Sequence, residues 1–256
     1  IKVIGVGGGG GNAVNHMYHQ GIGGVSFVLC NTDAQALRNS PVPVKVQLGA
    51  KGEGAGNIPE VAKKLAEESA AEVEALFDDN TRMAFITAGM GGGTGTGAAP
   101  VVARIAKEKG VLTVGIVTIP FLFEGEPKIL QAFAGVEEMR KHVDALLVIN
   151  NERLCKIYPD LSWTTAFAKA DDSLSNAARS IAELVSKDGK INLDFADVRT
   201  TLKDGGAAVI STGSGEGEHR MSRAIQNALT SPLLKESDIY GAERVLFNLY
   251  FSPEEG

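Results

Sequence analysis

Short apolar segments alternate with longer amphipathic segments from residue 1 to about residue 149. Apolar runs that predict buried strands lie at residues 1–6, 25–30, 82–88, 112–118 and 143–149. Amphipathic stretches between them predict helices at residues 12–20, 59–77, 98–109 and 126–142. Strands that alternate with helices are joined by crossovers, so we expect an α/β fold with a doubly wound, mostly parallel sheet.

A longer amphipathic segment follows. Apolar residues recur at helical spacing over residues 165–187, which predicts one long central helix. Beyond it, a loop at 189–194, helices near 195–203 and 218–229, and strands at 207–211 and 244–251 predict a partial α+β second domain. We therefore divide the chain into residues 1–164, a connecting segment at 165–190, and a C-terminal domain at 191–256 that we expect to be truncated.

The composition narrows the function classes. Of 256 residues, 44% are hydrophobic and 22% charged, as in an ordinary globular protein. The net charge is −6 without a Lys/Arg cluster, which argues against nucleic acid as the main partner. No apolar run approaches the ~20 residues that span a bilayer, and no leader precedes the first strand, so we expect neither membrane insertion nor export. The histidines show no ligand spacing with cysteines or acids, so we expect no protein-held metal site.

Glycine is concentrated in two places. Residues 5–10 fit the pattern G-x-G-x-x-G between a predicted strand and helix, where glycines let the backbone approach a diphosphate. Such a match alone is weak, because glycines also serve tight turns. Asp33 ends the second predicted strand, where a dehydrogenase places its ribose-binding acid. An NAD-dependent oxidoreductase is therefore one alternative.

The second glycine-rich segment, residues 89–97, weakens that alternative. It contributes six glycines together with Thr94 and Thr96, again between a strand and a helix. A dinucleotide needs one such loop, whereas two opposed loops suit a diphosphate or triphosphate held from both sides. No G-x-x-x-x-G-K-[ST] motif is present, so backbone amides, Thr94 and a metal ion would have to balance the phosphate charge.

Five motifs in the same order resemble one family. Residues 91–97 resemble the tubulin signature loop, and with residues 4–12, 31–37, 123–125 and 192–198 they resemble FtsZ, the family of bacterial tubulin-like cell-division GTPases. The resemblance runs from the first strand to about Phe251. It implies a tubulin-like GTP-binding domain at 1–164, a central helix and the start of a catalytic loop at 165–190, and an activation domain at 191–256.

The resemblance also implies roles for single residues in nucleotide binding. The residues that would contact the phosphates are Gly7, Gly8, Gly9, Asn12, Gly91, Gly92, Gly93, Thr94 and Gly95. Ala55 and Gly56 would belong to a loop that contacts the γ-phosphate. Glu124 would bind the ribose, and Lys128 stands where the family usually has Arg. Asn151 and Asp172 would recognise guanine, with Phe167 stacked on the base. The alternatives are a core role for Phe167 and a solvated helix turn for Asp171 and Asp172.

The resemblance also implies that catalysis needs a second copy of the chain. A helix of about 22 residues spans about 33 Å, so Asp194 and Asp197 cannot reach their own nucleotide. They would act, with Asn192, on the nucleotide of the next subunit in a head-to-tail filament. The alternative is that Asp194 only caps the helix at 195, a role from which Asp197 gains little.

The remaining expectations follow from the same resemblance. The cofactors would be GTP or GDP and Mg²⁺, with K⁺ as a further candidate. The partners would be other copies of the chain and, through C-terminal parts, membrane-tethering and regulatory division proteins. The location would be the cytoplasm at the mid-cell division site. A regulator that has lost hydrolysis is a third alternative, against which Asp194 and Asp197 argue.

Overall fold

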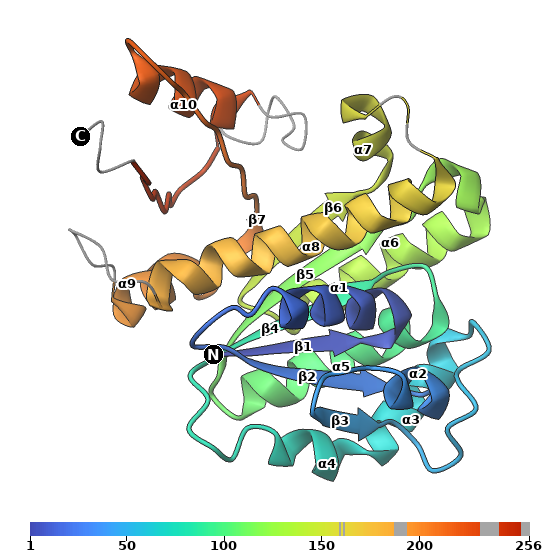
Figure 1. Cartoon of the computed structure of the whole chain (residues 1–256). Helices are drawn as coiled ribbons and strands as arrows, with labels where there is room; N and C mark the ends of the chain where they lie inside the picture. Colours follow the sequence, from blue (N-terminus) through green and yellow to red (C-terminus); the bar gives the residue numbers. More distant parts are fainter. Residues whose placement is uncertain (159, 161, 187–193, 231–240, 252–256) are drawn as a thin grey trace.

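Seven parallel strands form the central sheet (Figure 1). The structure is a computed structural model and describes residues 1–158, 160, 162–186, 194–230 and 241–251. The strand order is β3-β2-β1-β4-β5-β6-β7. The strands are Lys2–Val6 (β1), Ser26–Asn31 (β2), Val44–Gln47 (β3), Met83–Gly89 (β4), Leu112–Ile119 (β5), Ala145–Asn150 (β6) and Gly206–Ala208 (β7). The order reverses between β1 and β4, and ligands of open α/β sheets bind at the carboxyl ends beside such a reversal.

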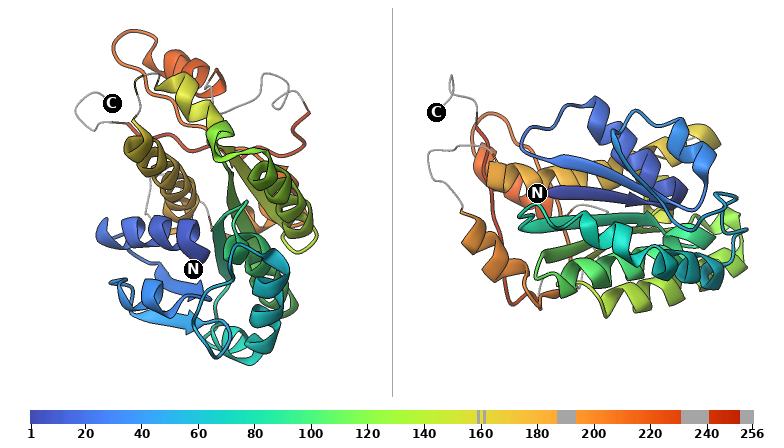
Figure 2. Two further views of the ribbon diagram at one scale, coloured as in Figure 1. Left: turned by 90° about the vertical axis from the view of Figure 1, so that its right-hand side faces the viewer. Right: turned by 90° about the horizontal axis from the view of Figure 1, so that it is seen from below.

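Helices cover both faces of the sheet, as Figure 2 shows. Helices α1 and α8 pack together on one face, and α3, α5 and α6 pack on the other. The helices are Gly7–His19 (α1), Ala34–Arg38 (α2), Pro59–Glu68 (α3), Ala70–Ala75 (α4), Gly93–Glu108 (α5), Glu126–Arg140 (α6), Glu152–Ile157 (α7), Trp163–Ser186 (α8), Phe195–Leu202 (α9) and Arg220–Leu229 (α10), with a 3₁₀ turn at Leu122–Glu124 (η1).

The apolar runs form strands because both faces of the sheet are covered. Every residue of β5 is buried, and alternate side chains enter opposite cores: Ile116 packs on the α1/α8 side and Val117 on the α5/α6 side. This is the pattern of a parallel sheet buried on both faces. The doubly wound α/β fold is therefore confirmed.

The long helix α8 crosses one face of the sheet (Figure 1). Its 24 residues span about 36 Å at 1.5 Å per residue. Leu174, Ala178 and Ile181 bury its inner side against the core that includes α1. One end of α8 lies toward the carboxyl ends of the strands, and the other leads toward α9 at the opposite edge. In the part of the chain that the structure describes, no helix is long and apolar enough to cross a membrane.

Two predicted helix starts were wrong. We expected helices to begin at residues 12 and 98, but α1 begins at Gly7 and α5 at Gly93, inside the glycine-rich segments. Glycine disfavours helix by about 1 kcal/mol relative to alanine, but packing against neighbouring backbone decides here. The helix predicted at 59–77 is broken at Ser69, whose hydroxyl accepts a hydrogen bond from the Gly49 nitrogen at 2.9 Å.

The C-terminal strands also differ from expectation. Strand β7 pairs in parallel with β6, with Ala145 opposite Gly206, and so extends the first sheet. No strand forms over residues 244–251, which the structure describes without regular secondary structure. The predicted loop at 189–194 lies outside the described residues except for Asp194. The division of the chain at residues 164 and 190 stays a prediction.

Candidate functional site

The two glycine-rich turns lie against each other at the carboxyl ends of β1 and β4. A methyl group built on Gly7 would come within 2.8 Å of the Gly95 nitrogen, and one on Gly9 within 3.2 Å of the Gly89 α-carbon. Gly7 also has φ of +73°, a conformation that L side chains rarely adopt. The starts of α1 and α5 are thereby brought together.

These glycines divide into two groups. A methyl group on Gly10 would come within 2.2 Å of the Thr87 carbonyl oxygen, and one on Gly95 within 2.3 Å of the Gly89 carbonyl oxygen. Such glycines are required by packing. Gly8 is exposed, and a methyl group there would meet nothing within 4 Å, while at Gly92 the nearest atom is 3.9 Å away. Gly8 and Gly92 therefore leave backbone open to a ligand.

The two helix starts offer unpaired donors. Neither Val6 nor Gly92, the residues that precede α1 and α5, caps its helix through a side chain. The first four N–H groups of a helix lack partners within the helix, and the helix dipole adds partial positive charge there. Two adjacent, uncapped helix starts form an anion site without any lysine.

A third segment closes the site from the α3 side. Gly54, Gly56 and Asn57 have φ of +83°, +58° and +62°, so the loop before α3 turns tightly. Ala55 is buried, and a methyl group on Gly93 would come within 3.1 Å of the Ala55 β-carbon. The predicted γ-phosphate loop thus touches the first residue of α5.

Hydrogen bonds fix the second glycine turn. The Gly91 nitrogen donates to the Thr96 hydroxyl at 2.9 Å. Gln131 of α6 donates through Nε2 to the Gly91 and Gly92 carbonyl oxygens at 3.1 and 3.2 Å. Gln131 could not be predicted from the sequence, because the contact joins segments about forty residues apart.

A cavity of about 50 Å³ adjoins the turns. Gly7, Gly8, Gly11, Asn12 and Asn31 are among its lining residues. Since ligand pockets commonly measure roughly 300–1,000 Å³, we expect a nucleotide to extend from it over the surface. A larger cavity of about 270 Å³ lies between α8, β6 and residues 208–212, away from the glycine turns.

The predicted ribose residues form an ion pair. Glu124 Oε2 lies 3.3 Å from Lys128 Nζ, and Glu124 Oε1 accepts a hydrogen bond from the Phe121 nitrogen at 3.0 Å. Lys128 therefore holds Glu124 from one side. Asn151 is 5% exposed, and its Oδ1 has no hydrogen-bond partner among the described residues. A buried carbonyl oxygen without a donor is rare, and a ligand donor would satisfy it.

Phe167 is not a core residue. Its side chain is 43% exposed and meets Phe121 and Phe123 edge-on, with ring centroids 5.5 and 6.0 Å apart. Phe121 and Phe123 are themselves stacked at 4.9 Å. This aromatic cluster holds Phe167 at the surface near the start of α8. Phe121 was missed in the sequence, because only the fold brings it to α8.

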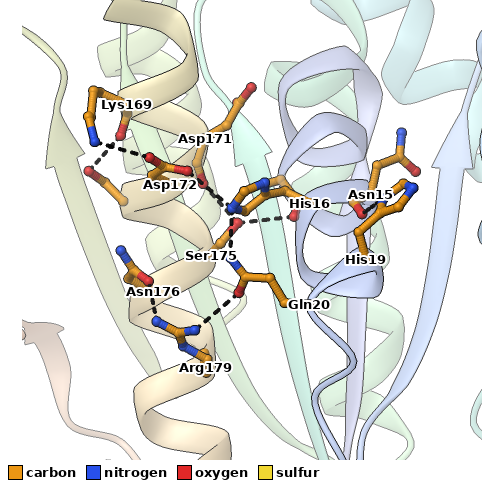
Figure 3. A network of polar contacts seen from close by, with 12 residues as sticks. Asn15, His16, His19, Gln20, Lys169, Asp171, Asp172, Ser175, Asn176 and Arg179 are labelled. Carbon is orange, nitrogen blue, oxygen red and sulfur yellow. Dashed lines mark hydrogen bonds and ion pairs between the residues drawn. The ribbon is translucent and has the colours of Figure 1, made fainter. Parts of the chain in front are cut away.

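Asp172 already has partners in the network between α1 and α8 (Figure 3). Its carboxylate lies 3.1 Å from His16 Nε2 and 3.4 Å from Lys169 Nζ. The same His16 nitrogen lies 2.7 Å from Gln20 Nε2. One ring nitrogen cannot both donate to Asp172 and accept from Gln20, so the tautomer of His16 decides which of the two contacts is a hydrogen bond.

Asp171 differs from its neighbour. Its carboxylate has no hydrogen-bond or ion-pair partner among the described residues, and Figure 3 shows it directed away from the network. Burial, followed by the nearby charge of Asp172, raises the pKa of the Asp171 carboxyl to about 6. Asp171 follows Phe167 by four residues and shares its helix face. The family resemblance points to Asp172, whereas Asp171 has the carboxylate without a partner among the described residues.

The predicted catalytic acids lie at the other edge of the sheet, on α9 (Figure 1). Both are exposed and bond to each other's backbone: the Asp197 nitrogen donates to Asp194 Oδ1 at 2.9 Å, and the Asp194 nitrogen donates to Asp197 Oδ2 at 3.3 Å. The expectation that Asp197 gains little from capping was wrong, because the pair forms a reciprocal capping box. Asn192 lies outside the described residues.

The α9 acids are held against the sheet by packing. Phe195 lies under the Arg82 guanidinium, 3.9 Å from its ring centroid. Val198 is fully buried in the α1/α8 core. One side of α9 is therefore fixed, and the acids face outward at the edge opposite the glycine turns.

Comparison with known proteins gives consistent matches. Residues 1–159 match the model of the Tubulin/FtsZ family GTPase domain, and residues 206–254 match the FtsZ family C-terminal domain. The cell division protein FtsZ of Porphyromonas gingivalis (strain ATCC BAA-308 / W83) is 65% identical over 259 residues, covering 100% of this chain and 57% of that protein. FtsZ of Buchnera aphidicola subsp. Schizaphis graminum (strain Sg) is 50% identical, covering 97% and 66%.

A solved structure agrees. An FtsZ dimer of M. jannaschii, described as empty, superposes with a TM-score of 0.87 at 44% identity, covering 91% of this chain and 68% of that chain. The present chain thus spans a little over half of the length of the P. gingivalis relative.

Proposed function

Because the chain belongs to the Tubulin/FtsZ family, we propose that it binds GTP at the two glycine turns and hydrolyses it with acids from a second copy of the chain. The observation that carries the proposal is the contact between the starts of α1 and α5 at Gly7 and Gly95. It joins two helix N-termini without side-chain caps into one anion site.

Each part of the nucleotide has a candidate partner. The open backbone at Gly8 and Gly92 would face the phosphates, with the loop at Ala55 and Gly56 beside the terminal one. Glu124 would accept from the ribose hydroxyls while Lys128 holds it. Asn151, with its unsatisfied oxygen, would accept a donor from the nucleoside.

The base would lie against Phe167 and a carboxylate of α8. A carboxylate can accept from both the N1–H and the 2-amino group of guanine, a pair that adenine lacks. Asp172 remains a candidate, but it is engaged by His16 and Lys169. Asp171 has no side-chain partner in the part of the chain that the structure describes and shares the face of Phe167, so we favour Asp171 for this role.

Metal ions would be held mainly by the nucleotide. Among the described residues, no three His, Cys, Asp or Glu side chains gather into a metal site. The donor set therefore fits a cation bound by phosphates, with the Thr94 hydroxyl as a protein ligand of the type that Mg²⁺ accepts in phosphate-binding loops. Bound Mg²⁺ would neutralise phosphate charge, and K⁺ is a second candidate.

Hydrolysis would be completed in trans. Asp194 and Asp197 lie at the edge opposite the glycine turns, beside the end of α8 that leads toward α9. A head-to-tail contact would bring them, with Asn192, to the neighbour's terminal phosphate, where a carboxylate can orient the attacking water. Such a contact repeats without closing and gives a filament.

The same proposal extends to the cell. The filament would form the cytokinetic ring in the cytoplasm at mid-cell. Parts of the protein outside this chain would bind membrane-tethering and regulatory partners. The FtsZ of M. jannaschii that superposes on this chain is a dimer, which supports self-association.

The alternative of an NAD-dependent oxidoreductase is disfavoured by Asp33. Its Oδ1 accepts hydrogen bonds from the Gln35 and Ala36 nitrogens at 2.8 and 3.2 Å, so Asp33 caps α2. The two capping bonds occupy Oδ1, which leaves only Oδ2 for a ribose hydroxyl. The contact between Gly7 and Gly95 also has no counterpart in a site that uses one glycine loop.

Equilibrium binding tests the proposal. Fluorescent analogues of GTP and ATP, and NAD itself, are titrated against the protein under identical conditions. We expect GTP to bind at least about tenfold more tightly than ATP, because adenine would leave polar groups of the base site unpaired. Tighter binding of NAD or equal binding of ATP would contradict the proposal.

A further inference from the structure

Thr32 lies beneath the second glycine turn. It follows directly after β2 and is 1% exposed. Its hydroxyl lies 2.7 Å from the hydroxyl of Thr94, the second residue of α5. A buried threonine thus holds the one side chain of the glycine turns that we expect to contact phosphate.

The backbone of Thr32 holds the other side of the site. Its carbonyl oxygen accepts a hydrogen bond from the Gly54 nitrogen at 3.0 Å. Next to it, the Ala34 nitrogen donates to the Gly52 carbonyl oxygen at 3.0 Å, and Asp33 forms an isolated bridge with Glu53. Residues 52–54 are therefore tied to the segment after β2. Thr32 is bonded both to Thr94 and to the loop next to the terminal phosphate position.

We propose that Thr32 is a positioning residue for the terminal phosphate: it orients the Thr94 hydroxyl and couples that orientation to the loop at Gly54. The inference rests on the proposed GTP binding. A hydroxyl has one proton and two lone pairs. When Thr32 donates to Thr94, Thr94 keeps its own proton for a phosphate oxygen. When Thr94 offers a lone pair to a cation, its proton goes to Thr32.

The two hydrogen bonds of Thr32 predict that it affects the binding of GTP and GDP differently. GTP and GDP share the α- and β-phosphates, so a residue that serves only the fold affects both equally. A residue that positions Thr94 and the Gly54 loop for the terminal phosphate affects GTP more. Thr32 therefore contributes more to the affinity for GTP than to the affinity for GDP.

Substitution of Thr32 by valine removes the hydroxyl at nearly constant shape. For Thr32→Val we expect GTP affinity to fall about tenfold, the range of one hydrogen bond, and GDP affinity to change less than about twofold. Thr32→Ser should restore GTP affinity. In Thr32→Val/Thr94→Val, GTP affinity should match that of Thr94→Val alone, because Thr32 acts through Thr94.

The matched control is Thr113→Val. Thr113 is a fully buried threonine on β5 whose hydroxyl bonds to the Val111 carbonyl oxygen at 2.9 Å, remote from the glycine turns. The Thr113→Val variant should leave the ratio of GTP affinity to GDP affinity unchanged. Circular dichroism and thermal unfolding check the fold of each variant. If Thr32→Val does not fold, Thr32→Cys keeps the volume with a weaker donor and should show an intermediate loss of GTP affinity.

The outcomes separate the two proposals. Equal loss of GTP and GDP affinity, no loss, or no rescue by serine would overturn the role of Thr32 while wild-type binding upholds the proposed function. Wild-type protein that binds neither guanine nucleotide would overturn the proposed function and this inference with it.

Discussion

Gly7 lies directly against Gly95, since a methyl group on Gly7 would come within 2.8 Å of the Gly95 backbone nitrogen. This contact joins the β1–α1 turn to the β4–α5 turn, two segments far apart in the sequence. The phosphate site that we propose exists only because both residues lack side chains.

Glycine substitutions should therefore separate packing from binding. Gly10→Ala forces a methyl group to within 2.2 Å of the Thr87 carbonyl oxygen, so we expect a loss of about 1–3 kcal/mol in the free energy of unfolding. The methyl group of Gly8→Ala would meet open space, so the free energy of unfolding should stay within about 0.5 kcal/mol of wild type. The same methyl group should weaken GTP binding. Denaturant unfolding and nucleotide titration measure the two effects. Similar stability losses in both variants would contradict the division of the glycines.

The pH dependence of GTP binding should report Asp171. Burial raises the pKa of its carboxyl to about 6, and the protonated acid can no longer accept from both guanine donors. We expect GTP affinity to fall about tenfold between pH 7 and pH 5, and Asp171→Asn to remove this dependence. Asp171→Asn should also favour XTP, which carries a carbonyl in place of the 2-amino group. If Asp172→Asn gives these changes instead, Asp172 recognises the base.

The raised pKa of Asp171 also affects the stability of the fold. An ion-paired acid stabilises a fold as pH rises, whereas Asp171 should do the opposite. The folded pKa lies above the unfolded value of 3.8, so the folded state favours the protonated form. The free energy of unfolding should therefore decrease as pH rises from about 4 to about 6. Asp171→Asn should flatten this part of the profile, measured by denaturant titration without nucleotide.

Asp197 has two separable roles. Asp197→Asn keeps an oxygen for the Asp194 nitrogen but removes the charge, so we expect unchanged stability and a GTPase rate at least about 100-fold lower. Asp197→Ala should lose the same activity and a few tenths to about 1 kcal/mol of stability. The control Asp204→Asn changes an exposed acid beyond α9 that lies 3.6 Å from Lys107, and should stay active. Wild-type activity in Asp197→Asn would exclude the acid from hydrolysis.

The fold could largely be predicted from the sequence because its strands are buried on both faces. Apolar runs such as those of β4 and β5 stand out against amphipathic helices. Short elements could not be predicted: β3 is a four-residue edge strand that is mostly exposed, and α2 depends on the cap at Asp33. The helix starts at Gly7 and Gly93 were missed because tertiary contacts override glycine's low helix propensity.

The site was predictable where residues act through local motifs. The glycine turns were proposed from their local pattern and Phe167 from the family resemblance, and their roles in nucleotide binding stay predictions. Thr32 and Gln131 were missed because each acts through a contact with a distant segment. Asp171 and Asp172 cannot be separated by spacing alone, since the choice depends on His16, which α1 brings to α8.

In the proposed mechanism, half of a GTPase site lies at each of two opposite edges of the sheet, with the glycine turns at one edge and Asp194 and Asp197 at the other. The most direct test is the rate of GTP hydrolysis per subunit at saturating GTP and Mg²⁺, measured over a wide range of protein concentrations. The account predicts a rate that is near zero at low concentration and rises as subunits associate. A rate per subunit that is constant over the whole range would contradict a site shared between neighbours.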